Sequence, residues 1–469
     1  MTEKSGARVF AADRYRLLHA VFGFCLLLWL SPAGANSDPL VGVLDGAGNA
    51  GLGIATRFEQ SLYRGGGTRN DLVPLYLYEG KHFYLHAYRL GLKLGEQTDN
   101  RFDVFLAHRF EGFPYDHIPA SLAGMAERGP GIDVGISYQH RSGAGTIFGE
   151  ILHDISNASG GNEVRAGYAY DWRSGGLHLR PQAMLAARDS SLNNYYYGVL
   201  PSEAAQGRPA YSPGAGVNGQ LSLYASYDLS ERWKLLAGIA ATRWSDPVRR
   251  SPIVDDRMQL SGVVGIAYDF APEHKPWQER TPFIVKLMHG RSTDCNLLPI
   301  MEFRCTSTAT SDGTTVTGVE IGRPFIERVN GWPLDFVGYV GAVNHDERGL
   351  QPSFWQIQAY MKAFYYGFPW SDRVRTRIGF GAGVSYAQKI PFVEARDQEQ
   401  RGRNTSKILN YLDPSIDVNV GDLFGARSLR ETYAGFGVSH RSGIFGTSQL
   451  LGNVSGGSNY IYSYVEWKM

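Results

Sequence analysis

A histidine and a serine stand two residues apart in the segment "YAGFGVSHRSGIFG", at His440 and Ser442. The apolar residues before them, Ala434, Phe436 and Val438, have the same parity. In a β-strand all five side chains therefore point to one face. A serine hydroxyl activated by a histidine, with a third group that orients the imidazole, is the arrangement used for nucleophilic attack on an ester. The segment predicts an ester-hydrolysing site if a third polar residue lies beside the histidine.

The next predicted strand, "NYIYSYVEWKM", begins at Asn459, which has the parity of Ile461 and Val465. We expect this asparagine to meet the histidine and the serine at one strand end. Ser442 would then be the nucleophile, His440 the general base and Asn459 the orienting group, and no metal or cofactor is required. The alternative is a histidine and a serine at a lipid–water boundary that hydrogen-bond to a loop or a headgroup. The residues leave both interpretations open.

The composition and the N-terminal segment indicate an exported protein. The chain has 469 residues, a net charge of +1 and 19% charged residues, and its lysines and arginines are spread evenly, which argues against nucleic acid as a partner. Residues 1–35 predict a cleaved signal peptide, with a basic start, the apolar run "AVFGFCLLLWL" and the small residues "SPAGA". The rival interpretation is a membrane anchor, but a spanning helix needs about 20 apolar residues and this run is shorter.

Two cysteines, Cys295 and Cys305, remain after the signal peptide. Two neighbouring cysteines in an exported chain predict one disulfide that closes a loop. The alternative is a pair of free thiols. No zinc pattern exists, because no further cysteines are available as ligands.

Segments of about ten residues with alternating apolar and polar positions recur along the chain, separated by turn residues, as in "LVPLYLYEG" and "GIDVGISYQH". Aromatic residues gather at the strand ends, and the second face of the strands is polar or glycine-rich. A soluble β-sandwich would need an apolar second face. The pattern therefore predicts an all-β protein of antiparallel transmembrane β-barrels in the outer membrane.

The series is interrupted once, by the proline-rich and charged residues 271–282, which predict a linker. About ten to twelve strands are expected in residues 40–270, and eight in residues 283–469. The eight candidates are Phe283–His289, Thr314–Arg323, Trp332–Asn344, Phe354–Phe368, Val374–Ala387, Leu409–Val420, Glu431–Ser442 and Asn459–Lys468. Two barrels in tandem are the preferred interpretation, and one large barrel with a kinked connector is the alternative.

A YYYGV motif, a Ser/Glu-Ala segment, a Tyr-x-Pro and a Ser-Pro-hydrophobic-Val-Asp loop follow one another in residues 193–255. In these motifs and their order, residues 40–270 resemble the MipA/OmpV family of MltA-interacting outer-membrane proteins. The residues that carry the resemblance are Tyr195, Tyr196, Tyr197, Gly198, Val199, Tyr211, Pro213, Ser251, Pro252, Val254 and Asp255. The resemblance implies a non-enzymatic scaffold with a murein hydrolase and a murein synthase as partners.

The tyrosine run Tyr195, Tyr196, Tyr197 and Gly198 offers flat amphipathic area at low entropic cost, which suits a contact loop. The alternative is that this loop folds into the barrel as a plug or lies at the membrane interface.

The last strands resemble the PagL-type lipid A deacylases, which are also described as acyloxyacyl hydrolase-like. "HRS", "GGSNYIYSY" and "ILNYLD" occupy the places of that family's motifs. The resemblance implies an eight-stranded barrel that hydrolyses an acyl ester of lipid A. Two residues depart from the family pattern: Asn459 replaces a carboxylate, and Gly443 replaces an asparagine that helps to bind the oxyanion.

Two further polar segments are predicted to be loops. One contains His345 and Asp346, which we expect to be solvated. The other is the mixed-charge segment Glu394–Asn404, in which Arg401 and Arg403 could contact lipopolysaccharide phosphates. The sequence thus predicts an outer-membrane protein with lipid and lipopolysaccharide as partners, and it leaves a scaffold and an esterase as candidate functions.

Overall fold

The computed structural model describes residues 50–96, 99–113, 118–255, 258–270, 282–308, 310 and 312–469. The predicted signal peptide and residues 271–281 of the predicted linker lie outside this part of the chain. None of the helices in the described ranges is long and apolar enough to span a membrane.

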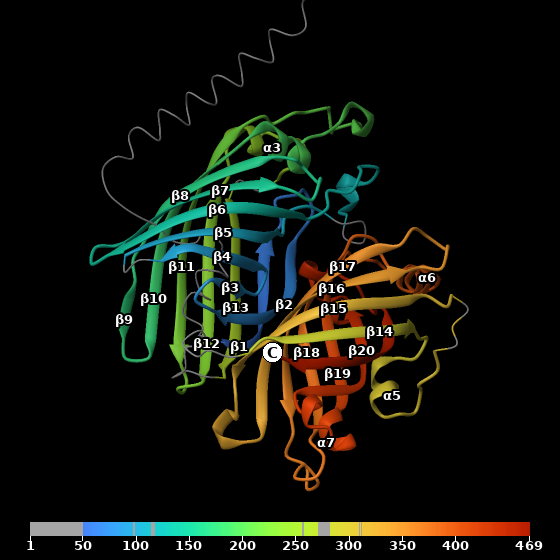
Figure 1. The fold of residues 1–469 in the computed structure, drawn as a ribbon. Helices are drawn as coiled ribbons and strands as arrows, with labels where there is room; N and C mark the ends of the chain where they lie inside the picture. Colours follow the sequence, from blue (N-terminus) through green and yellow to red (C-terminus); the bar gives the residue numbers. More distant parts are fainter. Residues whose placement is uncertain are drawn as a thin grey trace, which may run out of the picture.

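The first half of the chain forms one antiparallel sheet that closes on itself (Figure 1). Its strands are β1 (Ala50–Gln60), β2 (Thr68–Glu79), β3 (Phe83–His86), β4 (Arg89–Glu96), β5 (Asn100–Arg109), β6 (Gly131–Ser142), β7 (Gly145–Asp154), β8 (Asn162–Ala169), β9 (Trp172–Ser174), β10 (Leu177–Arg188), β11 (Gly216–Asp228), β12 (Trp233–Arg243) and β13 (Met258–Asp269). Strand β9 pairs with β10 alone, so the closed ring has 12 strands.

The second half forms a closed barrel of eight strands, in sequence order. They are β14 (Ile284–Ser292), β15 (Thr315–Ile326), β16 (Leu334–Asp346), β17 (Phe354–Tyr365), β18 (Thr376–Ala387), β19 (Ile408–Asn419), β20 (Thr432–Ser442) and β21 (Asn459–Lys468). Two barrels in tandem were the preferred prediction, and they are confirmed; the single large barrel is wrong.

Short helices and turns connect the strands. The helices are α3 (Ser190–Tyr197), α4 (Asp246–Arg249), α5 (Leu297–Met301), α6 (Phe392–Gln400) and α7 (Val420–Phe424). The 3₁₀ turns span Ala120–Leu122, Pro201–Glu203, Val329–Gly331, Arg427–Leu429, Ile444–Gly446 and Gln449–Leu451.

Strand β17 shows why the strands close into barrels. Trp355 and Ile357 point outward and are 50% and 56% exposed, whereas Gln356, Gln358 and Lys362 point inward and are at most 1% exposed. Exposure of an apolar outer face to water is unfavourable in free energy, whereas contact of the same face with lipid hydrocarbon is favourable. The inward polar groups satisfy one another: Lys362 contacts Asp413, and Gln356 donates to Gln358 over 2.7 Å.

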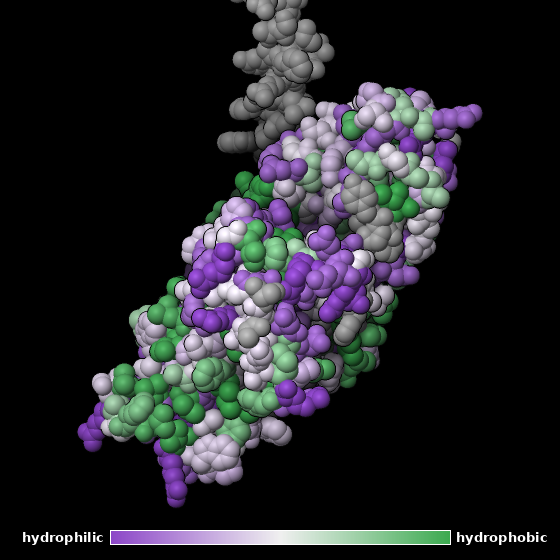
Figure 2. Space-filling model, turned by 90° about the vertical axis from the view of Figure 1, so that its right-hand side faces the viewer, coloured by the Kyte–Doolittle hydropathy of each residue, from purple (hydrophilic) through white to green (hydrophobic). Residues whose placement is uncertain are grey.

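Each barrel has two unlike ends. In the first barrel one end carries the segments 110–113, 118–130, 189–215 and 244–255, and the other carries tight turns such as residues 229–232. In the second barrel α5, α6 and the β20–β21 loop share one end, opposite the start of β14. We call these the loop end and the turn end. Figure 2 faces the side with α5 and α6, where hydrophilic residues gather between hydrophobic flanks.

The two barrels lie side by side with like ends together. At the turn end, the rings of Phe270 and Phe336 are 4.2 Å apart, and those of Tyr78 and Phe325 are 5.8 Å apart. Nearer the loop end, Tyr76 of β2 donates its hydroxyl hydrogen to Asn410 of β19. The contacts make β2 the wall of the first barrel that faces the second.

Candidate functional site

The tyrosine run forms helix α3 at the loop end of the first barrel. Asp189 accepts the backbone N–H of Leu192 over 2.9 Å and caps the helix, which ends at Gly198. Tyr196 is 0% exposed and Tyr197 is 3% exposed. They belong to a buried cluster, which we call the cap: Leu62, Tyr63, Phe113, Leu122, Met125, Leu192, Tyr196, Tyr197, Val199, Trp244, Val248, Ile253 and Val254. The cap covers the loop end of the first barrel (Figure 1).

Hydrogen bonds join the separate motif segments within the cap. Ser251 donates its hydroxyl hydrogen to the backbone oxygen of Tyr197 over 2.6 Å, and Tyr63 donates to that of Tyr196 over 3.0 Å. Tyr211 donates to the backbone oxygen of Pro247 over 2.8 Å. The motif segments are separate in the sequence, but their residues thus lie together in the cap.

The cap changes the interpretation of the predicted contact loop. Of its tyrosines, Tyr195 is half-buried, and its hydroxyl accepts the N–H of Gly129 over 3.0 Å. Tyr196 and Tyr197 face the interior, and burial raises the pKa of both, so their hydroxyls stay protonated. An exposed contact surface therefore does not contain these two side chains. Burial of the apolar surface of these rings between the loops stabilises the cap, because the surface is removed from water.

Glu203 holds the second loop of the cap. Its carboxylate accepts backbone N–H groups of Leu200 and Ala126, each over 3.0 Å, and the Arg128 side chain over 2.5 Å. Burial works to raise the pKa of this carboxyl, but the three hydrogen bonds outweigh it and lower the pKa below its ordinary value.

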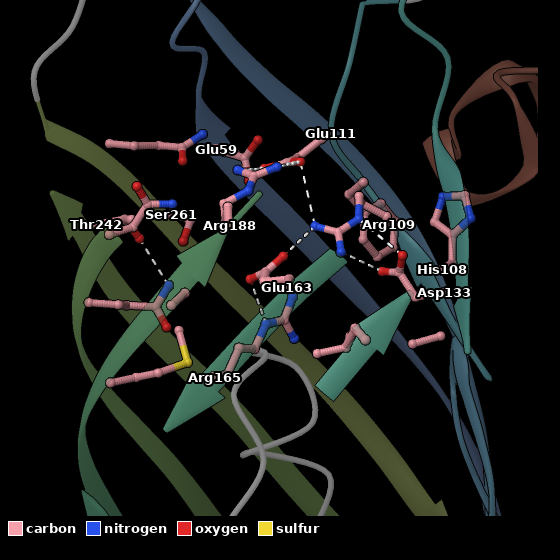
Figure 3. Close-up of a pocket in the computed structure, with 18 of the residues that line it drawn as sticks. Glu59, His108, Arg109, Glu111, Asp133, Glu163, Arg165, Arg188, Thr242 and Ser261 are labelled. Carbon is pink, nitrogen blue, oxygen red and sulfur yellow. Dashed lines mark hydrogen bonds and ion pairs between the residues drawn. The ribbon is translucent and has the colours of Figure 1, made fainter. Parts of the chain in front are cut away.

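A cavity of about 160 Å³ lies in the lumen of the first barrel (Figure 3). Its lining holds five arginines and four carboxylates: Arg57, Arg89, Arg109, Arg165, Arg188, Glu59, Glu111, Asp133 and Glu163. Trp244 of the cap also lines it, and the guanidinium of Arg188 lies 5.0 Å from the centre of the Trp244 ring. The cap therefore forms part of the cavity wall.

Ion pairs order the charged side chains of the cavity. Arg109 bridges Asp133 over 2.7 Å and Glu163 over 2.6 Å. Arg188 contacts Glu111 over 2.6 Å, and Arg165 contacts Glu163 over 2.7 Å. Buried charges of this kind need such partners, because desolvation of an unpaired ion is costly.

The sequence prediction did not name these cavity residues, although the sequence carries a signal for them. Arg57 and Glu59 are two positions apart, as are Glu163 and Arg165, so each pair shares one face of its strand. Opposite charges that alternate with apolar residues in a barrel strand indicate a lumen-facing pair.

Comparison with known proteins shows which family the first barrel matches. Residues 52–270 match the family model of MltA-interacting protein MipA. Residues 52–270 belong to the MipA/OmpV family. Among curated relatives, outer membrane protein OmpV of Vibrio cholerae is 32% identical over 160 residues, or 34% of this chain and 62% of OmpV. Omp26La of Vibrio anguillarum gives the same values. The MltA-interacting protein of Escherichia coli is 26% identical over 237 residues, or 49% of this chain and 93% of that protein.

The chain thus spans 62% of the length of OmpV and of Omp26La. Among solved structures, CdiB from Escherichia coli aligns with a TM-score of 0.25 at 8% identity, over 93% of this chain and 64% of that chain. We draw nothing from a likeness at that score. The relatives are outer-membrane proteins, and the protein is an outer-membrane β-barrel protein with a MipA/OmpV barrel. The family match ends at Phe270, one residue after β13.

The second barrel, outside the MipA/OmpV match, carries His440 and Asn459 as a cross-strand pair. The histidine Nδ1 lies 2.6 Å from the asparagine Oδ1. Because this oxygen is an acceptor, Nδ1 donates and Nε2 keeps a lone pair. The Ser442 hydroxyl instead accepts the N–H of Ile444 over 3.4 Å. Within the described part of the chain, the structure therefore joins two of the three predicted residues by a hydrogen bond.

Cys295 and Cys305 form a disulfide, as predicted, with their Cα atoms 5.8 Å apart. The loop that they close contains α5. Cys295 and Ile300 pack on Val438 of β20, and Ile461 of β21 is partly buried against them. This loop covers the outer surface of β20 two residues before His440.

The predictions of two solvated loops fail for His345 and for Glu394, whereas Arg401 and Arg403 are exposed. His345 is 1% exposed at the end of β16, stacked on Phe354 with 4.6 Å between ring centres. Segment Glu394–Asn404 begins inside α6, where Glu394 is buried and accepts from Arg441 over 3.0 Å. The physical reason is the same in both places: a lumen lined with polar groups buries charged residues that would be solvated in a soluble protein.

Proposed function

We propose that the MipA/OmpV barrel is a scaffold that binds a murein hydrolase of the MltA kind at the outer membrane. The family match over residues 52–270 carries this proposal, since the matching family is described as MltA-interacting protein MipA. The Escherichia coli relative of that name aligns over 93% of its length. The cap supports a binding role over that of an open pore, because it covers one mouth of the barrel.

The turn end offers the docking surface. Long loops of outer-membrane barrels face outward and short turns face the periplasm, where murein lies. Strand β9 stands outside the closed ring and pairs with β10 alone, so its second edge is unpaired within the described sheet. Its residues Trp172, Arg173 and Ser174 are all exposed. A free strand edge with an exposed tryptophan is suited to a protein partner.

Site-specific photo-crosslinking in cells tests the scaffold proposal. A photoreactive amino acid at Arg173 should capture a murein hydrolase, whereas the same residue at Arg250, exposed at the loop end, should not. Recovery of the same proteins from both positions, or of no murein enzyme from Arg173, would contradict the proposal.

A second candidate function is ester hydrolysis in the second barrel, favoured by the hydrogen bond between His440 and Asn459. The Ser442 oxygen would attack the carbonyl carbon of an acyl ester while His440 Nε2 takes the hydroxyl proton. That proton would then pass to the leaving alkoxide, and water would release the acyl group from the serine. Lipid A with ester-linked chains fits a site on the outer surface of the barrel.

Mass spectrometry of lipid A tests this second function. Expression of the native chain should remove one acyl chain, and Ser442→Ala should restore the full mass. Ser439→Ala, on the opposite face of β20, is the matched control. Lipid A of unchanged mass with the native chain ends the esterase hypothesis.

A further inference from the structure

The wall of the MipA/OmpV barrel is incomplete beside β2. Strand β2 pairs with β1 along its length, but its other edge pairs with β3 only through Leu77–Glu79. Beyond the backbone bond from Ala87 to Tyr76, no strand of the first barrel pairs with residues 68–75 in the described sheet. Pro74 lies in this stretch with the parity of Tyr76, so its nitrogen, which carries no hydrogen, faces the unpaired side. Proline occurs in strands at such edges.

The β20–β21 loop, residues 443–458 of the second barrel, closes this gap. The backbone N–H of Leu72 donates to the backbone oxygen of Thr447 over 2.9 Å. Leu451 and Val454 of the loop are both 0% exposed, in one buried cluster with Tyr88 and Phe110 of the first barrel. A segment of one barrel thus completes the wall of the other.

The cavity lies directly behind the gap. Tyr88, His108 and Phe110 line the cavity, and two of them also belong to the cluster at the gap. Figure 3 shows His108 at the edge of the cavity, beside a ribbon in the colour of the C-terminal part. The guanidinium of Arg57 lies 4.6 Å from the centre of the Phe110 ring. An apolar gap therefore leads to a charged chamber.

The chamber has hydrogen-bond donors to spare. Arg188 Nε and Arg89 Nη2 are buried donors with no partner among the described residues. The ring nitrogens of His108 have none either, and at least one of the two is a donor. Each of the five arginines of the lining has a carboxylate partner, so the spare donors, rather than an excess of positive charge, favour an anion. A buried donor without an acceptor is costly, so an anionic group in the chamber would be stabilised.

We propose that the gap between β2 and β5 is a lateral entrance to the cavity, closed by the β20–β21 loop. Its ligand is a single-chain amphiphile with an anionic headgroup, drawn from the outer leaflet. The headgroup binds Arg57 and Arg188, and the acyl chain lies against Tyr88 and Phe110. This binding activity goes beyond the scaffold function and does not depend on it. An amphiphile fits because the cap covers the mouth of the barrel, whereas the gap opens in the barrel wall beside β2.

Two glycines lie where the loop joins β21. Gly456 and Gly457 precede β21 with φ of 117° and 159°, conformations that other residues rarely adopt. One backbone hydrogen bond, from Leu72, holds the loop to the edge of β2. Local opening of such a segment costs far less than unfolding of the barrel.

Photolabelling in phosphatidylcholine proteoliposomes tests the ligand. The probes are 16-carbon chains that carry a diazirine and end in a carboxylate, a phosphate or a neutral hydroxyl. We expect an acidic probe to label peptides with Tyr88 or Phe110 roughly tenfold more than the alcohol, the ratio for one charge-assisted hydrogen bond. Arg188→Gln should remove this preference, whereas Arg173→Gln, exposed at the turn end, should keep it. The two acidic probes distinguish a carboxylate from a phosphate ligand. Equal labelling by all three probes overturns the proposal, and this comparison needs no variant.

A removable crosslink tests the gate. The Leu72 N–H donates to the Thr447 oxygen over 2.9 Å, so the two residues are close enough to try a disulfide between Leu72→Cys and Thr447→Cys as a lock for the loop. Oxidation should abolish labelling by the acidic probe and reduction should restore it. Labelling of the native chain with and without reductant shows the effect of reducing Cys295–Cys305. The single variant Thr447→Cys shows the effect of the substitution without a crosslink. Labelling that is the same in the locked and the reduced protein overturns the lateral entrance.

Discussion

Ser251 donates its hydroxyl hydrogen to the backbone oxygen of Tyr197 over 2.6 Å, although 54 residues separate them in the sequence. The bond fastens the loop after β12 to the end of α3. Because both groups are buried, the carbonyl would have no partner if the hydroxyl were removed. The cap thus depends on a contact between two of the motif segments that identify the family.

Ser251→Ala should loosen the cap without unfolding the barrel. We expect a local cost of about 1–3 kcal/mol, the range for leaving a buried group unsatisfied. Hydrogen exchange of backbone amides in α3 should therefore accelerate by roughly 5- to 150-fold. Ser174→Ala, at an exposed position on β9, is the control and should leave this exchange unchanged. Unaltered protection of α3 in the Ser251 variant would show that the bond is dispensable.

The cap should also loosen in acid, through Glu203. Its folded-state pKa is lowered by Arg128 and two backbone N–H groups, so the carboxylate form is favoured in the folded protein. The stability that this group contributes is present above its unfolded pKa, about 4.3, and is lost as pH falls through the lower folded value. The protection of the Ala126 and Leu200 amides against exchange, relative to unstructured amides at the same pH, should therefore fall below about pH 4.

Glu203→Gln separates this effect from general acid destabilisation. The variant should show low protection of both amides at neutral pH, and this protection should change little further in acid. A native-like pH profile in the variant would assign the acid response to another group.

The alternation of residues in the sequence predicts the strands of the second barrel well. The last strand is expected at Asn459–Lys468 and observed there, because lumen tyrosines alternate with lipid-facing residues over its whole length. The pairing of His440 with Asn459 follows from the same parity. Local patterns of this kind indicate which face of a strand points to the lumen and which to the lipid.

Contacts between distant segments are less accessible from one sequence. The tyrosine run carries no helical periodicity, although Asp189 before it is a helix N-cap signal. The buried position of His345 depends on Gln356 and Phe354 of the neighbouring strand, and the closure of the gap beside β2 depends on a loop more than 300 residues away. Such relationships arise from tertiary packing, which a periodic pattern does not encode.

The disulfide should hold the α5 loop against the outer surface of β20. Cys295→Ser with Cys305→Ser removes a crosslink that constrains the unfolded loop, with a cost of about 2–3 kcal/mol by loop-closure entropy. We expect a protease added to intact cells to cut within residues 296–304 of the variant but not of the native chain. Arg304→Ala, an exposed substitution inside the same loop, is the control. Resistance of the double variant would mean that packing on Val438 alone fixes the loop.

Asp413 should be the side chain on which the second barrel depends most. It contacts Lys286 over 3.3 Å, accepts from Tyr462 over 2.8 Å, and contacts Lys362. Asp413→Ala leaves Lys286 with Glu320 as a carboxylate partner and removes the carboxylate that Lys362 contacts. We expect a cost of about 3–5 kcal/mol, the range for breaking a buried ion pair by removing one partner. The measurement is the temperature at which the folded barrel loses its fast mobility in detergent gels, and Asp372→Ala, at an exposed position, should not lower it. If both variants melt like the native protein, the charges of the lumen are screened by water and the network contributes little to stability.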